Sequence, residues 1–181
     1  PFSLAVAALT LASQPAFAET KVGVAAAVKN QVQGGNARSI AVGGSVFANE
    51  RIRTGDAATA QFMFLDKTVM SMGPKAELVL DKYVYNPNRA SGGQVVVNAV
   101  QGTMRFVTGS QNPTNYQIKT PVATLGIRGT VVDLKVSQVQ TFIGVIEGSL
   151  TIRMLDGTTL TIGKGEYVVI SKTGSVIGKG P

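Results

Sequence analysis

The chain has 181 residues, enough for one domain with a buried core, and it contains no Cys, no His and no Trp. These absences exclude disulfides, thiolate nucleophiles and zinc–sulfur sites, and they remove the usual neutral-pH general base and the commonest transition-metal ligand. The formal charge of +7 favours anionic partners. Because the 17 basic residues are scattered and no three are adjacent, we do not expect a nucleic-acid function.

Residues 1–18 are typical of an export signal. An apolar run over 4–11 is too short to span a bilayer, and Ala-Phe-Ala at 16–18 matches the small-x-small cleavage pattern. Cleavage there would leave Glu19 first, and since no Met or basic stretch precedes Pro1, we expect the printed sequence to lack its first residues. An uncleaved anchor or a buried apolar strand is the alternative. We expect a periplasmic or secreted bacterial protein with no integral membrane segment after cleavage.

From Lys21 onward, most segments alternate apolar and polar residues with a period of two, and Gly, Asn, Asp or Pro separates them. Clear examples are 60–64, 94–97, 131–136 and 149–153. A helical candidate over 23–28 is short and equally compatible with a strand. The pattern therefore predicts an all-β protein. We expect a lead-in over 19–40, a β domain over 41–172 and a Gly-rich tail over 173–181.

Two segments, 64–80 and 154–170, resemble each other in sequence. Five residue types recur at matched positions: Leu65 and Leu155, Asp66 and Asp156, Thr68 and Thr158, Gly73 and Gly163, Val79 and Val169. A second matched pair surrounds Gly102 and Gly148. Repetition at about 45 residues predicts a solenoid-like stack of short strands, with chance similarity between hairpins as the alternative. The equivalent Asp positions favour turn chemistry over catalysis or calcium binding.

Residues 118–130 read IKTPVATLGIRGT, and this segment resembles the signature of the FecR family. Parts of 42–55, 62–80, 100–102 and 145–148 resemble other strands of that family, so the similarity covers roughly residues 40–170. The resemblance implies an all-β periplasmic module, which in the namesake proteins follows an anti-sigma segment and a membrane helix and relays signals from a siderophore receptor. A signal so close to the domain leaves no room for those segments. We therefore expect a stand-alone exported form and do not carry over the sigma-regulating activity.

The signature residues are Thr120, Pro121, Ala123, Gly126, Arg128, Gly129 and Thr130. Pro121 suits an edge or entry position, and Ala123 suits close packing. Gly126 and Gly129 suit turns or close backbone approach, and Thr130 suits a local hydrogen bond. Arg128 is expected either to brace this corner, through turn carbonyls or a carboxylate such as Asp133 or Glu147, or to contact an anionic group on a partner. The bracing role is favoured.

Two turn-rich stretches, 83–93 and 108–116, are candidate contact loops, which makes Tyr83, Tyr85 and Arg89 possible partner contacts together with Arg128. No Ser stands in a recognisable nucleophile setting, and no pair of carboxylates stands out as a glycosidase pair. We therefore expect no catalytic residue, no metal and no cofactor.

These observations predict an exported, non-catalytic FecR-type domain that binds or scaffolds a protein or an anionic envelope polymer. A structural, self-assembling element of the cell surface is the alternative, because unpaired strand edges invite pairing. A periplasmic component of an envelope signalling system is the third hypothesis.

Overall fold

The computed structural model describes residues 19–87 and 93–181, and within these ranges the chain is all-β, as its alternating pattern predicts. Two short 3-10 helices, η1 (Gly35–Ala37) and η2 (Pro113–Asn115), interrupt the strands. The strands are β1 (Lys21–Lys29), β2 (Val32–Gln33), β3 (Ser45–Phe47), β4 (Arg51–Thr54), β5 (Thr59–Phe64), β6 (Val69–Met72), β7 (Glu77–Val84), β8 (Gln94–Val107), β9 (Tyr116–Lys119), β10 (Ala123–Val136), β11 (Gln140–Met154), β12 (Thr159–Gly163), β13 (Tyr167–Ser171) and β14 (Val176–Gly180).

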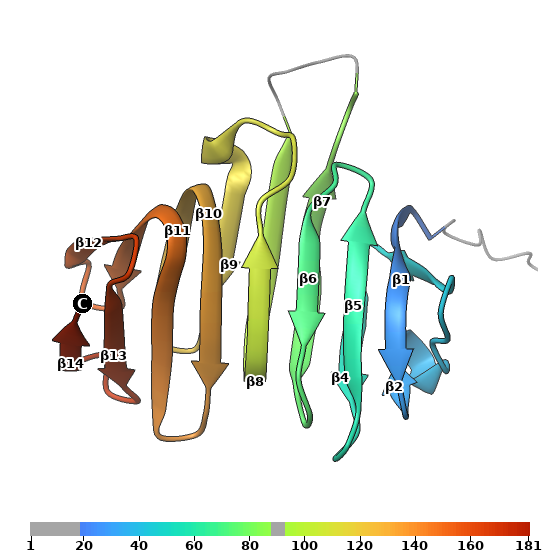
Figure 1. Ribbon diagram of the computed structural model, residues 1–181, viewed down its shortest axis with the longest axis horizontal. Helices are drawn as coiled ribbons and strands as arrows, with labels where there is room; N and C mark the ends of the chain where they lie inside the picture. The colour runs from blue at the N-terminus through green and yellow to red at the C-terminus, as the bar shows by residue number, and fades with distance from the viewer. Residues whose placement is uncertain (1–18, 88–92) are drawn as a thin grey trace, which may run out of the picture.

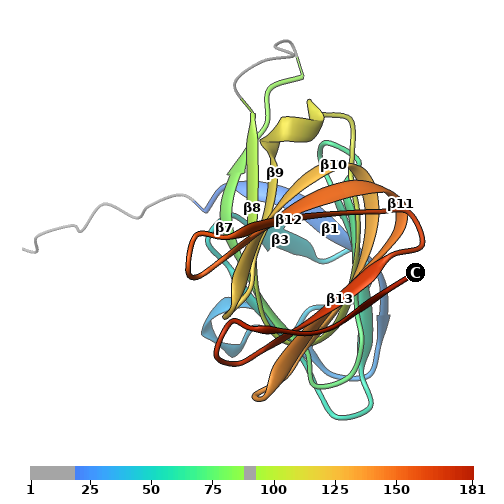
Figure 2. The same ribbon diagram turned by 90° about the vertical axis from the view of Figure 1, so that its left-hand side faces the viewer.

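The fourteen strands form one continuous sheet, which curls so that two layers face each other (Figures 1 and 2). The front layer contains β3, β1, β5, β6, the second halves of β8 and β10, the first half of β11, β13 and β14. The back layer contains β2, β4, β7, β9, β12 and the remaining halves of the three long strands. Among the described strands, neighbours are antiparallel except for β8 and β9.

The long strands β8, β10 and β11 change layers at glycines. Up to Gln101, β8 pairs with β7, and from Gly102 onward it pairs with β10 in the front layer. Gly102 has a φ of 93°, and the equivalent glycines Gly129 and Gly148 have φ values of 54° and 79°. L-residues with a Cβ rarely adopt this left-handed conformation, so glycine is what lets each strand bend between the layers.

The core fills the space between the layers. Buried and exposed residues alternate most clearly in β5, where Ala60, Phe62 and Phe64 are buried and their neighbours are exposed. Phe106 of the front layer and Ile118 of the back layer are likewise fully buried. Burial of one such large side chain contributes about 1.5–3 kcal/mol to the free energy of unfolding. Burial of apolar side chains between the layers is therefore the main contribution that stabilises their packing.

The stretches expected to flank the β domain are part of the sheet. In the predicted lead-in, β1 pairs with both β3 and β5, and in the predicted tail β14 pairs with β13. The predicted export signal, residues 1–18, lies outside the described residues. In the part of the chain that the structure describes, no helix has the length and apolar character needed to cross a membrane.

The two similar segments adopt the same local structure. Residues 64–80 and 154–170 each run from a strand end through a turn, a strand and a second turn into another strand. In both, the turn Asp accepts a hydrogen bond from the backbone of the Thr two residues later, at 3.0 Å for Asp66 and 2.8 Å for Asp156. The stacked unit of about 45 residues stays a prediction, because the registers establish hairpins along one continuous sheet.

Candidate functional site

The first half of the 118–130 signature forms the turn between β9 and β10. The Thr120 backbone N–H donates to the Ala123 carbonyl at 2.8 Å, and the Thr120 hydroxyl accepts from the Ala123 N–H at 3.0 Å. Pro121 is exposed at the tip of this turn, so its lack of a backbone N–H removes no hydrogen bond from the fold. Ala123 is buried, so this half of the signature defines a tight turn that starts on the core.

The second half of the signature forms the corner where β10 changes layers. Gly126 lies within β10, three residues before Gly129, where the strand bends. The buried Thr130 hydroxyl lies 2.8 Å from the Arg128 carbonyl and 2.7 Å from the Ser149 carbonyl, which ties β10 to β11. A Cβ at Gly148 would lie only 2.2 Å from the carbonyl oxygen of Gly129. The two strands therefore cross with their backbones in direct contact.

Arg128 itself takes no part in these hydrogen bonds through its side chain. Its side chain is exposed, and the structure gives it no hydrogen-bond or ion-pair partner among the described residues. Asp133, one of its expected partners, instead accepts two hydrogen bonds from Arg105, at 2.6 and 2.7 Å. The reason is geometric, since Arg128 pairs with Ser149 in the back layer and Asp133 lies on the front layer.

Of the three predicted loop contacts, Tyr83 is half-buried and packs against the core. It belongs to β7, its ring stacks on Phe64 with centroids 5.7 Å apart, and its hydroxyl donates to the Asp66 carboxylate at 2.9 Å. Tyr85 is half-buried and lines a cavity of about 500 Å³, in which residues 85–87 meet residues 110–113 of the second predicted loop. Arg89 lies outside the described residues.

The Asp66 carboxylate is fully buried at the centre of a hydrogen-bond network, here called the Asp66 cluster. Its donors are the Thr68 N–H (3.0 Å), the Thr68 hydroxyl (2.8 Å), the Tyr83 hydroxyl (2.9 Å), the Tyr116 hydroxyl (2.8 Å) and the Gln111 amide (3.1 Å). The cluster joins the β5–β6 turn to β7, β9 and the loop before β9. Because five donors occupy the acceptor sites of this carboxylate, it has a structural role and no room for substrate or metal.

The two tyrosine hydroxyls of the Asp66 cluster have raised pKa values. Burial, opposed by hydrogen bonds, raises the pKa of Tyr116 from 10.0 to about 12. Burial likewise raises the pKa of Tyr83 well above its ordinary value. Asp156, the surface counterpart of Asp66, has a lowered pKa because its carboxylate accepts the backbone hydrogen bond of Thr158.

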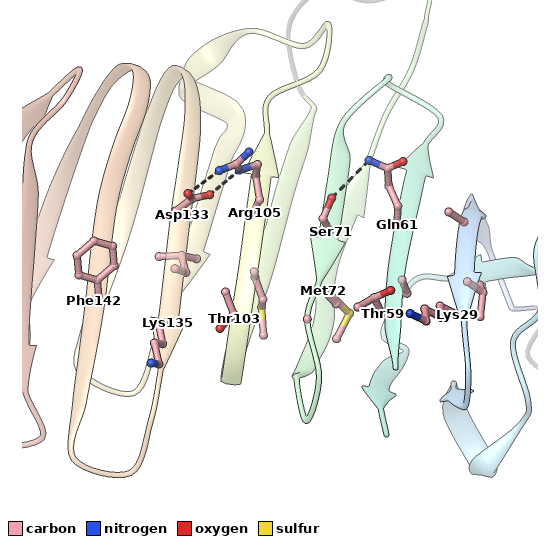
Figure 3. Close-up of a pocket in the computed structure, with 16 residues that line it drawn as sticks. Lys29, Thr59, Gln61, Ser71, Met72, Thr103, Arg105, Asp133, Lys135 and Phe142 are labelled. Carbon is pink, nitrogen blue, oxygen red and sulfur yellow. Dashed lines mark hydrogen bonds and ion pairs between the residues drawn. The ribbon is translucent and has the colours of Figure 1, made fainter. Parts of the chain in front are cut away.

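A groove of about 730 Å³ crosses the outer face of the front layer, and we call it the front groove (Figure 3). It extends over β1, β5, β6, β8, β10 and β11. Its lining residues are Ala27, Val28, Lys29, Thr59, Ala60, Gln61, Ser71, Met72, Gly73, Thr103, Met104, Arg105, Asp133, Leu134, Lys135 and Phe142. No residue of the 118–130 signature is among them, so the groove is a surface that sequence reasoning missed.

Strand registers arrange the side chains of this face in rows that run across the strands. An apolar row at one edge consists of Val24, Met63, Val69, Val107 and Val131. The middle row consists of Ala27, Gln61, Ser71, Arg105 and Asp133. The third row, which we call the lysine row, consists of Lys29, Thr59, Gly73, Thr103, Lys135 and Phe142. The front groove follows the middle row and the lysine row.

The polar groups of the middle row are already paired with one another. Arg105 and Asp133 form the bidentate ion pair described above, and Gln61 lies 3.4 Å from the Ser71 hydroxyl. In the described chain, the ammonium groups of Lys29 and Lys135 have no such partner. The front groove therefore presents two free cations and several neutral hydroxyl groups.

The described residues contain no group of three or more His, Cys, Asp or Glu side chains placed to hold a metal ion. The Asp133 carboxylate of the front groove is held by Arg105, and the Asp66 carboxylate is enclosed.

Comparison with known proteins gives a family and a fold. The family model described as FecR protein matches residues 50–151, which is more than half of the chain. Two crystal structures of a candidate anti-sigma factor from Parabacteroides distasonis, at 1.65 and 2.50 Å, superpose with TM-scores of 0.58 and 0.56 at 16% and 15% identity. The alignments cover 72% of this chain but 58% of the solved chains, and this degree of identity shows the fold alone. No curated protein matches the chain.

The matched range contains the Asp66 cluster, the turn of Thr120 and Pro121, and the corner of Arg128 and Gly129. It therefore includes each structural feature that the 118–130 signature builds. This chain belongs to the FecR protein family.

Proposed function

We propose that this chain is an exported and non-catalytic FecR-type module that binds a partner in the bacterial envelope. The observation that carries the proposal is the front groove, a surface of about 730 Å³ with free cations and neutral donors over a rigid sheet. Family membership and the apolar segment over 4–11 support a site of action outside the cytoplasm. In this proposal the β domain extends to both ends of the described sheet.

The proposal assigns the 118–130 signature to structure and binding to the front groove. Thr120 and Thr130 are engaged within the fold, which supports a structural role for the signature. Arg128 and Tyr85 are kept as secondary contact candidates, because Arg128 is exposed and Tyr85 lines a second cavity.

A self-assembling role is a second candidate, and the sheet edges favour it. At one end of the molecule β14 pairs with β13 and β12 pairs with β11, so each leaves one edge without a neighbour among the described strands. Val176 and Ile177 of β14 are exposed there, at 42% and 59%. An open strand edge is a template for pairing with another chain. Molar mass measured across concentration distinguishes this role, because a constant monomer mass contradicts it.

A signalling role is the third candidate, and it is supported by the likeness to a candidate anti-sigma factor at a TM-score of 0.58. In that case the envelope partner of the front groove would be a protein of a signalling complex. This role requires a second component that responds when the groove is occupied.

Photo-crosslinking from single positions tests the proposed function. A photoreactive residue replaces Thr103 in the front groove, and in the control it replaces Thr161 on the outer face of the back layer; both positions are exposed on strands. We expect an envelope component to be captured from Thr103 and not from Thr161. Capture from Thr161 alone would place binding on the back layer, and recovery of this chain alone would favour self-assembly.

An Arg128→Ala variant completes the experiment, because the side chain is exposed and the substitution leaves the fold intact. Retention of the partner captured at Thr103 is expected. Loss of that partner, with an unchanged melting temperature, would move the contact surface to the signature corner.

A further inference from the structure

The lysine row gives the front groove a direction across the strands. Lys29 on β1 pairs in register with Thr59, Thr103 on β8 pairs with Lys135, and Lys135 pairs with Phe142 on β11. Figure 3 shows Lys29, Thr59, Thr103, Lys135 and Phe142 along one line across the sheet. A ligand that follows this row is therefore elongated and lies across the strands.

The two free cations stand at a defined distance. Four strand spacings separate Lys29 from Lys135, which corresponds to about 19 Å between their backbones. A single small anion cannot contact both ammonium groups at this distance, whereas an extended chain with repeated negative charges can. The sheet between them is held by backbone hydrogen bonds, so the separation is fixed before binding.

Neutral groups line the path between and beside the cations. The Thr59 and Thr103 hydroxyls each provide one donor and accept hydrogen bonds, which suits a partner rich in hydroxyl groups. At the far end, Phe142 stacks on Tyr167 with ring centroids 5.6 Å apart and an interplanar angle of 22°. The side of the Phe142 ring that is turned away from Tyr167 offers an apolar surface on which the C–H face of a sugar ring can pack.

The charge within the groove selects the sign of the ligand. The Asp133 carboxylate is neutralised by Arg105, so Lys29 and Lys135 give the groove a net charge of two positive units. A protein partner would be anchored by large aromatic or Arg side chains in a fully desolvated pocket, whereas the front groove is open to solvent and carries Lys29 and Lys135 beside the apolar atoms of its lining. Single-stranded nucleic acid would need several stacking aromatics along the path, and Phe142 is the one aromatic side chain in the lining.

We propose that the front groove binds an anionic polysaccharide, extended across the strands, with its acidic groups on Lys29 and Lys135 and a sugar ring on Phe142. This inference rests on the proposed binding function and names the class of ligand for the same site. The binding is electrostatic in part and weakens as salt is added.

Binding of the 181-residue chain to polygalacturonate, with uncharged dextran of similar length as the comparison, tests the inference by calorimetry or affinity electrophoresis. The variant Lys29→Gln/Lys135→Gln removes the groove cations. The control Lys164→Gln/Lys172→Gln removes two exposed lysines from turns at either end of β13 and changes the net charge equally. We expect the groove variant to bind about tenfold more weakly, the loss expected for two partly exposed charge contacts, and the control to bind as the unchanged chain does.

Two further variants keep the result independent of folding. Lys29→Arg/Lys135→Arg retains both charges and is expected to retain binding, while Lys29→Glu/Lys135→Glu is expected to abolish it. Equal weakening of the groove variant and the control would overturn the inference, because it would show general attraction by net charge. Equal binding of polygalacturonate and dextran would also overturn it.

The experiment separates this inference from the proposed function. If no polysaccharide binds while the Thr103 photo-crosslinker captures an envelope protein, the ligand class is wrong and the binding function stands. If neither polysaccharide nor any envelope component reaches the groove, both are wrong.

Discussion

The replacement Asp66→Ala is expected to be among the most destabilising single changes in this protein. The carboxylate is fully buried and accepts five hydrogen bonds, from two positions of Thr68 and from the side chains of Tyr83, Gln111 and Tyr116. Truncation removes the common acceptor and leaves these donors facing a cavity. The substitution therefore perturbs four segments of the chain at one point.

The magnitude follows from the number of donors that lose their acceptor. Each buried polar group left unsatisfied costs about 1–3 kcal/mol, and breaking a buried charged network by removal of one partner costs about 3–5 kcal/mol. Since water entering the cavity replaces part of these hydrogen bonds, we expect a loss of about 4 kcal/mol in the free energy of unfolding. For a chain of this size that corresponds to a fall of about 8–16 °C in Tm.

Urea unfolding followed by far-UV circular dichroism measures this loss, and the similar turn at Asp156 supplies the control. Asp156 occupies the equivalent turn position, accepts the same hydrogen bond from Thr158 at 2.8 Å and is exposed. The urea midpoint of Asp156→Ala is expected to equal that of the unchanged protein within experimental scatter. Equal effects of the two substitutions, or a loss below about 1 kcal/mol for Asp66→Ala, would refute the assignment of the cluster as a structural centre.

Gly148→Ala is expected to cost about 3 kcal/mol, because it places a Cβ only 2.2 Å from the Gly129 carbonyl oxygen at an unfavourable φ of 79°; Gly129→Ala, whose Cβ would meet nothing within 4 Å, is expected to cost about 1 kcal/mol. Urea midpoints measure the difference, and equal costs contradict the close crossing. Thr130→Val is expected to cost about 1–2 kcal/mol in the same assay through its buried hydroxyl, and an unchanged midpoint contradicts a bracing role. The pKa of Tyr116 is about 12 in the folded protein and 10.0 in the unfolded chain. The contribution of its protonated hydroxyl to the free energy of unfolding is therefore complete below pH 10 and is lost as the pH rises to about 12. Thermal melts between pH 9 and about 12 should show Tyr116→Phe less sensitive to alkali than the unchanged protein, and parallel curves would contradict this.

The short-range features of this protein could be predicted from its sequence. Alternation with a period of two predicts strands because successive side chains of a strand point to opposite faces, and the burial of Ala60, Phe62 and Phe64 follows that pattern. The equivalence of Gly102 and Gly148, visible in the sequence, corresponds to matching left-handed corners. Such features depend on neighbours within a few residues, and those neighbours are present in the sequence itself.

Contacts between distant residues escaped the same reasoning. Tyr83 had the sequence context of an exposed loop residue, yet its hydroxyl bonds to Asp66, and Tyr116 reaches the same carboxylate from 50 residues away in the sequence. A local pattern carries no signal for such a pairing, because it depends on which strands become neighbours. Arg105 and Asp133, 28 residues apart, illustrate the same limit.

The sequence by itself determined that the chain forms strands, where those strands turn and bend, and which family signature it carries. Only the tertiary structure decided which outward side chains share a surface. Lys29, Thr103 and Lys135 belong to three strands that are far apart in the chain, and strand order and register align them into the front groove. The physical reason is that a strand's own residues set which side chains face outward, whereas hydrogen bonding between distant strands sets what lies beside them.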